Sequence, residues 1–209
     1  LGHRPKQNNT LYHERKESML SRIRYALSKY WQNRAQLQRY CFSPELQLTS
    51  VLDLSVADLT ALGIKALVLD FDGVLASHAE PEPRAEVAYW LNKLQRDFAP
   101  HQIYILSNKP TRERQNYFAK NFPGIIFIIA ARKKPYPDGL QQIVTLSGLA
   151  AGQVLLIDDR LATGILAVII SGVRGLWLTK PYTNFFVRPM VETWFMCLRG
   201  LERFGCKII

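Results

Sequence analysis

Cysteine is scarce in this 209-residue chain, which has only Cys41, Cys197 and Cys206. The odd number and the lack of metal-ligand spacing argue against a disulfide framework and a zinc site. Long apolar runs are also missing, because the longest nearly uncharged one, 161–173, is too short to cross a bilayer. The polar opening is not that of a secretory leader. We therefore expect a cytoplasmic protein, and a peripheral contact with a membrane stays open as an alternative.

Acidic residues are fewer than basic ones, and the imbalance is concentrated near the N-terminus. The net charge is +10, and residues 1–40 hold nine Lys and Arg against two Glu, so +7 lies there and +3 on the remaining 169 residues. Such a segment suits an anionic contact, either lipid headgroups, RNA or an acidic protein face. A solvated basic helix explains the same charge, and no nucleic-acid motif accompanies it, so specific nucleic-acid binding is not expected.

A helical pattern occupies residues 14–41. Apolar side chains recur there at three- and four-residue steps: Leu20, Ile23, Leu27, Tyr30, Leu37 and Cys41. Basic residues fill much of the opposite face, which predicts a basic amphipathic helix. Such a helix either packs on its own domain or lies on an anionic membrane surface.

Beyond Gly63, apolar strands alternate with helices. A short helix predicted at 55–62 precedes Gly63. After it the pattern predicts strands at 64–69, 102–106, 125–129, 154–157 and 175–178. The helices predicted between and after these strands are at 83–98, 111–121, 138–147, 160–171 and 185–204. Continuous apolar strands that alternate with helices are typical of a parallel sheet covered on both faces. The sequence therefore predicts an α/β fold with a Rossmann-like parallel sheet.

A polar cluster follows each of the first four of these strands, where an open parallel sheet binds its ligands. The clusters are Asp70-Phe71-Asp72-Gly73, Ser107-Asn108-Lys109, Lys133-Lys134-Pro135 and Asp158-Asp159-Arg160. Each alone also fits an ordinary turn or helix cap. Their occurrence at four successive strand ends favours a single site.

The chemistry of these residues matches phosphoryl transfer. Asp70 is a candidate nucleophile that would form an aspartyl-phosphate, and Asp72 a candidate general acid and base. Asp159 adds a third carboxylate, and Asp70, Asp72 and Asp159 together suit Mg²⁺, which prefers oxygen ligands. The Ser107 hydroxyl, the Asn108 amide and the Lys134 ammonium would bind the phosphate oxygens.

The series V-L-D-F-D-G-V-L, I-L-S-N-K, K-K-P and I-D-D-R resembles the four motifs of the haloacid dehalogenase (HAD) superfamily. Segments 62–66, 131–135 and 159–163 resemble its subclass III, the YqeG-like branch related to phosphatidylglycerophosphate phosphatases. The resemblance covers about 41–204 and implies a Mg²⁺-dependent phosphatase acting through Asp70. It assigns Asp72 as acid/base, Ser107 and Lys134 as phosphate ligands and Asp159 as a metal ligand. It divides the chain into a basic helical extension, 1–42, and a HAD-like phosphatase domain, 43–209.

Two positions depart from the pattern of that family. Val74 stands where the first motif usually has threonine, and Thr163-Gly164 stands where the fourth motif commonly ends in T-D. Asp158, in turn, occupies a position that is more often glycine. We expect Asp158 to compensate for the missing acid from behind the metal ligands.

The motif spacing limits what can cover the site. Asp72 and Ser107 are 35 positions apart and Ser107 and Lys134 are 27 apart, which leaves no room for a capping domain. A capless, open site predicts a bulky substrate, either a phospholipid headgroup such as phosphatidylglycerophosphate or a phosphoprotein such as one with phosphotyrosine. The resemblance favours the lipid, while the lack of an evident anchor keeps the protein substrate close to it.

Two further interpretations concern the rim of the site and the loss of activity. His78, in the loop at 77–83, is expected to be solvated, with substrate contact as the alternative. The changes at Val74 and Gly164, with the basic N-terminal segment, also fit a catalytically weak binding module for an anionic partner or a membrane surface. Loss of aryl phosphate hydrolysis on Asp70→Asn would distinguish the enzyme from the module. A dehalogenase is disfavoured, because that reaction has no use for the third carboxylate.

Overall fold

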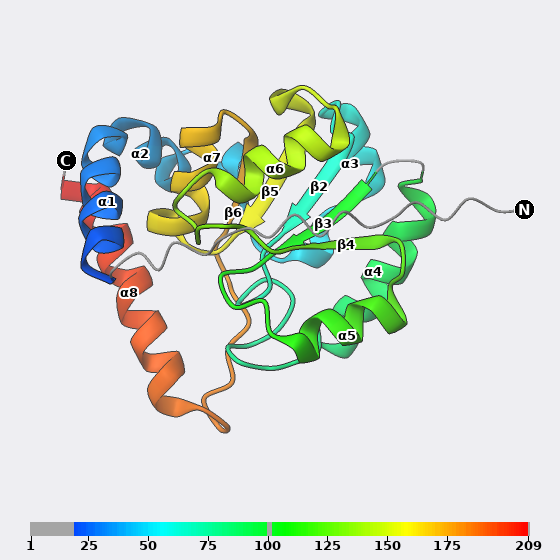
Figure 1. The fold of residues 1–209 in the computed structure, drawn as a ribbon. Helices are drawn as coiled ribbons and strands as arrows, with labels where there is room; N and C mark the ends of the chain where they lie inside the picture. The colour runs from blue at the N-terminus through cyan, green and yellow to red at the C-terminus, as the bar shows by residue number, and fades with distance from the viewer. Residues whose placement is uncertain (1–18, 100–101, 209) are drawn as a thin grey trace, which may run out of the picture.

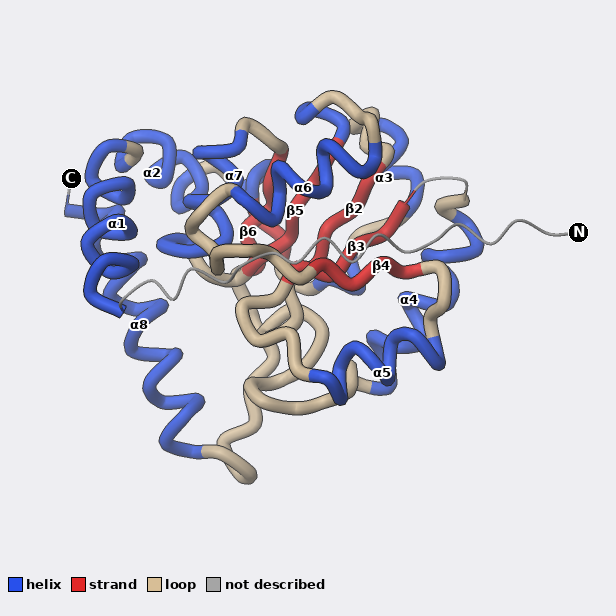
Figure 2. Tube along the Cα trace, in the orientation of Figure 1, coloured by secondary structure: helices blue, strands red, loops and turns tan. Residues whose placement is uncertain are grey.

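The computed structural model describes residues 19–99 and 102–208. It contains a six-stranded sheet in the order β1-β6-β5-β2-β3-β4, and every neighbouring pair is parallel. The strands are β1 (Gln47–Leu48), β2 (Ala66–Leu69), β3 (Gln102–Leu106), β4 (Ile125–Ile128), β5 (Val154–Asp158) and β6 (Arg174–Leu178). The predicted Rossmann-like parallel sheet is confirmed (Figures 1 and 2).

Helices cover both faces of this sheet (Figure 1). They are α1 (Met19–Gln32), α2 (Arg34–Phe42), α3 (Val56–Ala61), α4 (Ala85–Asp97), α5 (Arg112–Asn121), α6 (Asp138–Ser147), α7 (Leu166–Ser171) and α8 (Pro189–Ile208). One-turn helices stand at Pro44–Leu46, Val51–Asp53, Ala151–Gln153 and Leu161–Ile165.

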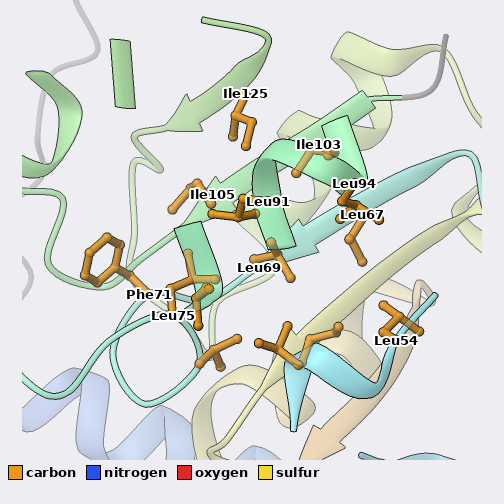
Figure 3. Close-up of a cluster of buried hydrophobic side chains, with 14 of the residues drawn as sticks. Leu54, Leu67, Leu69, Phe71, Leu75, Leu91, Leu94, Ile103, Ile105 and Ile125 are labelled. Atoms are coloured by element: carbon orange, nitrogen blue, oxygen red, sulfur yellow. The ribbon is translucent and has the colours of Figure 1, made fainter. Parts of the chain in front are cut away.

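Two hydrophobic clusters, one on each face, follow from the alternation of side chains along the strands. Leu67 and Leu69 of β2 belong to the cluster with α3, α4 and α5, which Figure 3 shows. Ala66 and Val68 of the same strand belong to the cluster with α2, α6 and α7. Because β2 is buried on both faces, it holds the following residue, Asp70, in a fixed position.

Most predicted elements have the expected bounds within a few residues. The strand at 102–106 and the helix at 138–147 match exactly the observed β3 and α6. The side chains of Ser55 and Thr111 accept hydrogen bonds from the first turns of α3 and α5, which fixes where those helices begin. The two-residue β1 was not predicted, because so short an edge strand carries no alternation.

The predicted helix at 14–41 lies partly outside the described residues. Within them it consists of α1 and α2, which meet at Asn33, whose side chain donates to the Lys29 carbonyl. Leu37 and Tyr40 of α2 are buried against the domain, whereas α1 has no buried residue. Packing on the domain therefore applies to α2 more than to α1.

The two last predicted helices differ from expectation at their starts. The segment predicted as a helix at 160–171 opens with a π-helical turn, Leu161–Ile165, before α7. The C-terminal helix begins at Pro189 rather than at 185. Proline suits the first position of a helix, because the backbone N–H that it lacks would have no partner within the helix there. Among the described helices, none is both long and apolar enough to span a bilayer.

Candidate active site

The four polar clusters lie at the carboxyl edge of the sheet. Asp70 follows β2, and Asp158 and Asp159 lie at the end of the neighbouring strand β5. Ser107 follows β3, on the other side of β2. The chain turns in opposite directions on the two sides of β2, and such a switch point forms the crevice in which open α/β sheets bind ligands.

Three buried carboxylates gather at this edge of the sheet. Asp70, Asp158 and Asp159 each offer an oxygen within 4.8 Å of the others. Lys134 Nζ lies 2.9 Å from Asp70 Oδ1 and 2.5 Å from Asp158 Oδ2, and the lysine is itself buried. Asp70, Lys134 and Asp159, each predicted for the site from a separate motif, therefore lie together. Asp158 is a direct member of the cluster rather than a residue behind it.

The burial of these acids controls their protonation. Burial raises the pKa of Asp70 to about 8, opposed by Lys134 and reinforced by Asp158 and Asp159. Burial likewise raises the pKa of Asp159 to about 6, opposed by the charge of Arg199. Burial would lower the pKa of Lys134, but Asp158 and Asp70 outweigh it and raise that pKa. The ammonium is therefore charged, while burial works against the ionised forms of Asp70 and Asp159.

A divalent cation fits this cluster. Asp159 Oδ1 is buried and has no hydrogen-bond partner, since Arg199 binds the other oxygen, Oδ2. An orphaned carboxylate oxygen among acids of raised pKa is suited to a hard cation, which favours the ionised forms. Asp70, Asp158 and Asp159 would supply the protein ligands. The carboxylate of Asp72, predicted as a metal ligand together with Asp70 and Asp159, is not part of this group of oxygens.

Asp72 is held instead by a buried arginine from α5. Arg114 donates from Nη2 to Asp72 Oδ1 at 2.6 Å and from Nη1 to Oδ2 at 3.0 Å. The Ala79 amide also donates to Oδ1, at 3.1 Å. Burial would raise the pKa of Asp72, but Arg114 outweighs it and holds that pKa below its usual value. The arginine fixes the orientation of the candidate acid/base and favours its ionised form.

Ser107 and Asn108 join two of the motif loops. The Asn108 side chain donates to the Lys134 carbonyl at 3.1 Å and accepts from the Lys134 amide at 2.8 Å. The Ser107 hydroxyl accepts from the Lys109 amide at 3.1 Å and is buried. The Asn108 side chain therefore positions the loop that carries Lys134. This role was not predicted, since the sequence suggested only a phosphate contact by the Asn108 amide.

Two glycines allow close approaches around the acids. Gly73 has φ +86°, and a Cβ there would lie 2.7 Å from Asp159 Oδ2. At Gly164, a Cβ would lie 1.9 Å from Cγ of Asp158. A side chain at 164 and the Asp158 carboxylate would thus occupy the same space, which supports the expected compensation between these positions. Val74, the other departure, is fully buried in the hydrophobic core.

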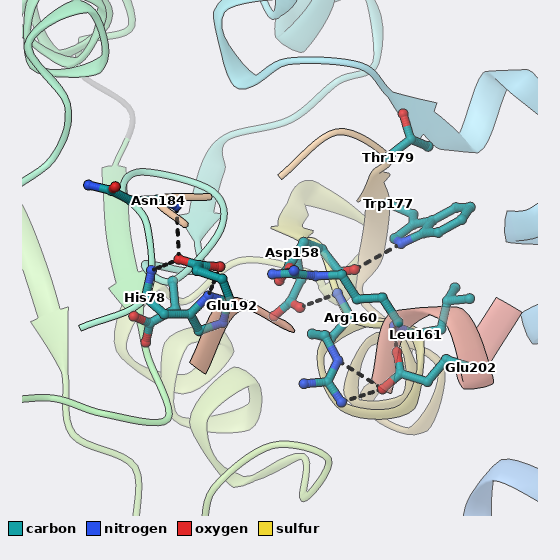
Figure 4. A network of polar contacts seen from close by, with 12 residues as sticks. His78, Asp158, Arg160, Leu161, Trp177, Thr179, Asn184, Glu192 and Glu202 are labelled. Carbon is teal, nitrogen blue, oxygen red and sulfur yellow. Dashed lines mark hydrogen bonds and ion pairs between the residues drawn. The ribbon is translucent and has the colours of Figure 1, made fainter. Parts of the chain in front are cut away.

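The C-terminal helix forms a further wall of the site (Figure 4). Arg199 Nε donates to Asp159 Oδ2 at 2.6 Å. Glu202 accepts from Arg160 Nε at 2.8 Å and from the Leu161 amide at 2.9 Å. Through these contacts α8 orients the loop that carries the fourth motif.

His78 is neither solvated nor free, so the expectation for this residue is wrong. It is buried, its ring stacks on Phe195 with centroids 3.8 Å apart, and its Nδ1 lies 3.1 Å from Glu192 Oε2. The Glu192 carboxylate also accepts from the backbone amides of His78 and Asn184 (Figure 4). The histidine anchors the loop after Asp72 onto α8.

Sequence reasoning missed two groups of supporting residues. Glu192, Arg199 and Glu202 interrupt an apolar helix at positions i, i+7 and i+10, which places them on one face. That spacing was a readable sign that α8 turns charge towards the domain. Arg114 gave no comparable sign, because a basic residue in the first turn of a helix is usually solvated.

A family model described as haloacid dehalogenase-like hydrolase matches residues 8–172. No curated protein matches the chain. Among solved structures, a Haemophilus influenzae phosphatase, the cobalt-bound deoxy-D-mannose-octulosonate 8-phosphate phosphatase, is 16% identical with a TM-score of 0.43, covering 66% of this chain and 90% of its own.

Two further structures have similar scores. A hypothetical protein from Xanthomonas campestris is 16% identical with a TM-score of 0.46, covering 72% of this chain and 92% of its own. A haloacid dehalogenase-like hydrolase from Streptococcus pneumoniae is 15% identical with a TM-score of 0.43, covering 58% of this chain and 88% of its own. The family model spans more than half of the sequence and includes all four motifs, so the chain belongs to the haloacid dehalogenase-like hydrolase family.

Proposed function

We propose that the protein is a Mg²⁺-dependent phosphatase that hydrolyses a phosphomonoester through an aspartyl-phosphate at Asp70. The observation that carries this proposal is the buried cluster in which Asp70, Asp158 and Asp159 lie together with Lys134. A carboxylate nucleophile, a cation site and a buried ammonium are what phosphoryl transfer to an aspartate requires. Bound at the three carboxylates, Mg²⁺ would neutralise charge on the phosphate oxygens.

The reaction proceeds in two displacements. A carboxylate oxygen of Asp70 attacks phosphorus, the bond from phosphorus to the alcohol or phenol oxygen breaks, and protonated Asp72 gives its proton to that leaving oxygen. Water then attacks the same phosphorus, Asp72 takes the water proton, and the bond to Asp70 breaks. The products are the dephosphorylated substrate, inorganic phosphate and regenerated Asp70.

The residues around the nucleophile support this sequence. Lys134 lies 2.9 Å from Asp70, where its charge opposes the rise of the pKa of Asp70 by burial and where it can stay close to the phosphate oxygens. Arg114 orients Asp72 but favours its ionised form, so the arginine contact must loosen when Asp72 carries the proton. Ser107, at the end of β3, offers its hydroxyl to the phosphate.

An open site and a bulky substrate are part of the proposal. Between Asp72 and Ser107 the chain forms a loop, α4 and β3, and between Ser107 and Lys134 it forms α5 and β4. The described residues of these stretches contain no separate folded unit, which supports a capless site. The substrate class is a phospholipid headgroup such as phosphatidylglycerophosphate, or a phosphoprotein, and membership of the YqeG-like branch would favour the lipid.

The test is phosphate release from an aryl phosphate with added Mg²⁺. Wild type is compared with Asp70→Asn, and an EDTA arm removes the metal. We expect metal-dependent release that the substitution lowers by at least about 10³-fold, since the nucleophile is lost. Equal release by wild type and variant would contradict the assignment of Asp70.

A catalytically weak binding module is the second candidate. The observation in its favour is the pairing of Asp72 with Arg114, because an ionised Asp72 cannot protonate a leaving group. An aryl phosphate with a good leaving group needs little protonation, whereas an alkyl phosphate needs it fully. Wild-type activity on neither substrate, from a folded and Mg²⁺-loaded protein, would favour the module.

A further inference from the structure

Helix α8 has its charged side turned inward and its apolar side turned outward. Glu192, Arg199 and Glu202 are buried against the motif loops. On the opposite side of the helix, large apolar residues are exposed at successive spacings of four, seven and three residues: Met190, Trp194, Leu201 and Phe204. A helix that serves only the core would show the reverse arrangement.

A second apolar surface lies beside this one. Helix α1 lies against the C-terminal part of α8 (Figure 1), where the Tyr30 hydroxyl donates to the Glu202 carbonyl at 2.8 Å. The exposed apolar residues of α1 are Met19, Leu20, Ile23, Leu27 and Trp31. In the segment just before α8, the exposed apolar residues are Phe185, Phe186 and Val187. We call these residues, with Met190, Trp194, Leu201 and Phe204 of α8, the α1/α8 face. Isolated exposed apolar residues are ordinary, but a set of this size on adjacent helices marks an interaction surface.

The exposed charges on the helices of the α1/α8 face and on the segment before α8 are of one sign. Residues 19–42, which form α1 and α2, hold five basic residues and no acidic one. In the described part of α8 and the segment before it, from 185 to 207, Arg188 and Lys207 are exposed, whereas both glutamates are buried. An apolar surface with a purely basic surround complements a surface that is apolar within and anionic at its edge.

We propose that the α1/α8 face docks on an anionic lipid bilayer. Apolar side chains would enter the boundary between headgroups and acyl chains, with Trp194 and Trp31 at the depth that tryptophan favours. The basic residues would meet the anionic headgroups. A second copy of the chain fits less well, because facing two such surfaces would bring basic residues together without acidic partners.

Docking at this face would place the motif loops near the lipid surface. Trp194 lies two residues from Glu192, which binds the loop that follows Asp72, and Leu201 lies next to Glu202, which binds Arg160. The same helix thus carries the lipid contact on one side and the support of the site on the other. The docking itself does not depend on the proposed phosphatase reaction.

The test is co-sedimentation of the full chain with vesicles of phosphatidylcholine, with and without phosphatidylglycerol. We compare wild type with the double variant Trp194→Ser/Leu201→Ser. The matched control is Tyr89→Ser/Leu146→Ser, which removes two exposed apolar residues from α4 and α6 instead. Thermal melting shows whether each variant is folded, and aryl phosphate hydrolysis is measured on all three proteins without vesicles.

We expect wild type and control to bind the anionic vesicles and the double variant to bind at least about tenfold more weakly, since apolar burial contributes much of the affinity. Neutral vesicles should bind weakly, and phosphate release without vesicles should be equal in all three. Equal vesicle binding by wild type and the double variant would overturn the proposal. Concentration-dependent dimerisation that the double variant abolishes, without vesicle binding, would also overturn it and identify an interface between copies. If none of the three proteins, wild type included, released phosphate while wild type still bound the vesicles, the proposed phosphatase function would be rejected and the docking proposal would stand.

Discussion

The carboxylate of Asp158 fills the space that a side chain at Gly164 would need. A Cβ on Gly164 would lie 1.9 Å from Cγ and 2.0 Å from Oδ2 of Asp158. The acid that the family commonly carries after Thr163 is absent, and Asp158 brings a carboxylate to the same place from the end of β5. The unusual residues Asp158 and Gly164 are thus one exchange, which leaves Lys134 with its second acidic partner.

This exchange predicts that the two positions can be swapped only together. Gly164→Asp alone should destabilise the protein by at least about 3 kcal/mol, because the new side chain collides with a buried carboxylate. Asp158→Gly alone should fold but lose most activity, since Lys134 then has Asp70 as its remaining acidic partner. The double variant Asp158→Gly/Gly164→Asp should recover both. Thermal melts and phosphate release measure the outcome, and a double variant worse than either single one would refute the exchange.

The bidentate contact of Arg114 with Asp72 predicts a strong and unequal response to substitution. Arg114→Met leaves the Asp72 carboxylate buried without its countercharge, which should cost about 3 kcal/mol of stability. Arg114→Lys keeps the charge but loses the two parallel hydrogen bonds, so it should fold better.

The pH profile separates positioning from bulk stability in these variants. Since Arg114 holds the pKa of Asp72 low, the acidic limb that reflects Asp72 as the base of the second displacement should move to higher pH in Arg114→Lys. Phosphate release measured across pH checks this. An unshifted acidic limb together with normal stability would show that the arginine does not control Asp72.

The buried acids predict how stability depends on pH without metal. Asp159 and Asp70 have folded pKa values of about 6 and about 8, above those of the unfolded chain. Their contribution to stability is therefore complete below the unfolded pKa values and is lost as pH rises through about 6 and then about 8. In EDTA the free energy of unfolding should fall as the pH rises from the unfolded pKa values to about 8. Added Mg²⁺ should offset the loss, because the cation favours the ionised carboxylates.

Urea unfolding with EDTA or with Mg²⁺, over a series of pH values, measures this directly. The stabilisation by Mg²⁺ should grow with pH across that window. In Asp70→Asn the fall of stability should end near pH 6 instead of near pH 8, and the response to the metal should be weaker. A metal response that is independent of pH would count against a cation at these carboxylates.

The sequence predicted the sheet well and the surroundings of the site poorly, for a physical reason. Strands such as β2 and β5 are buried on both faces and therefore carry continuous apolar runs, and the polar residues that end them stand out. Asp70 and Asp159 were readable for that reason, whereas Lys134, which follows the partly exposed β4, was readable from the K-K-P segment. Residues that act from other elements carry no such local pattern.

Arg114, Arg199 and His78 show this limit. Each is a polar residue whose partner lies far along the chain, so only tertiary packing decides that it is buried. The position of Asp158 relative to Gly164 depended likewise on how closely the turn after β5 approaches the strand end. Both positions stood out because they depart from the family pattern. That the Asp158 carboxylate fills the space of a side chain at 164 follows only from the folded structure.

The most direct test of the account is chemical trapping of the phosphorylated residue. Wild type is mixed with excess aryl phosphate and Mg²⁺, quenched, and treated with borohydride, which reduces an acyl phosphate to an alcohol. Peptide mass spectrometry should then find homoserine at position 70 and an unchanged residue at 72. Homoserine at Asp72, or turnover without any reduced carboxyl group, would contradict Asp70 as the nucleophile.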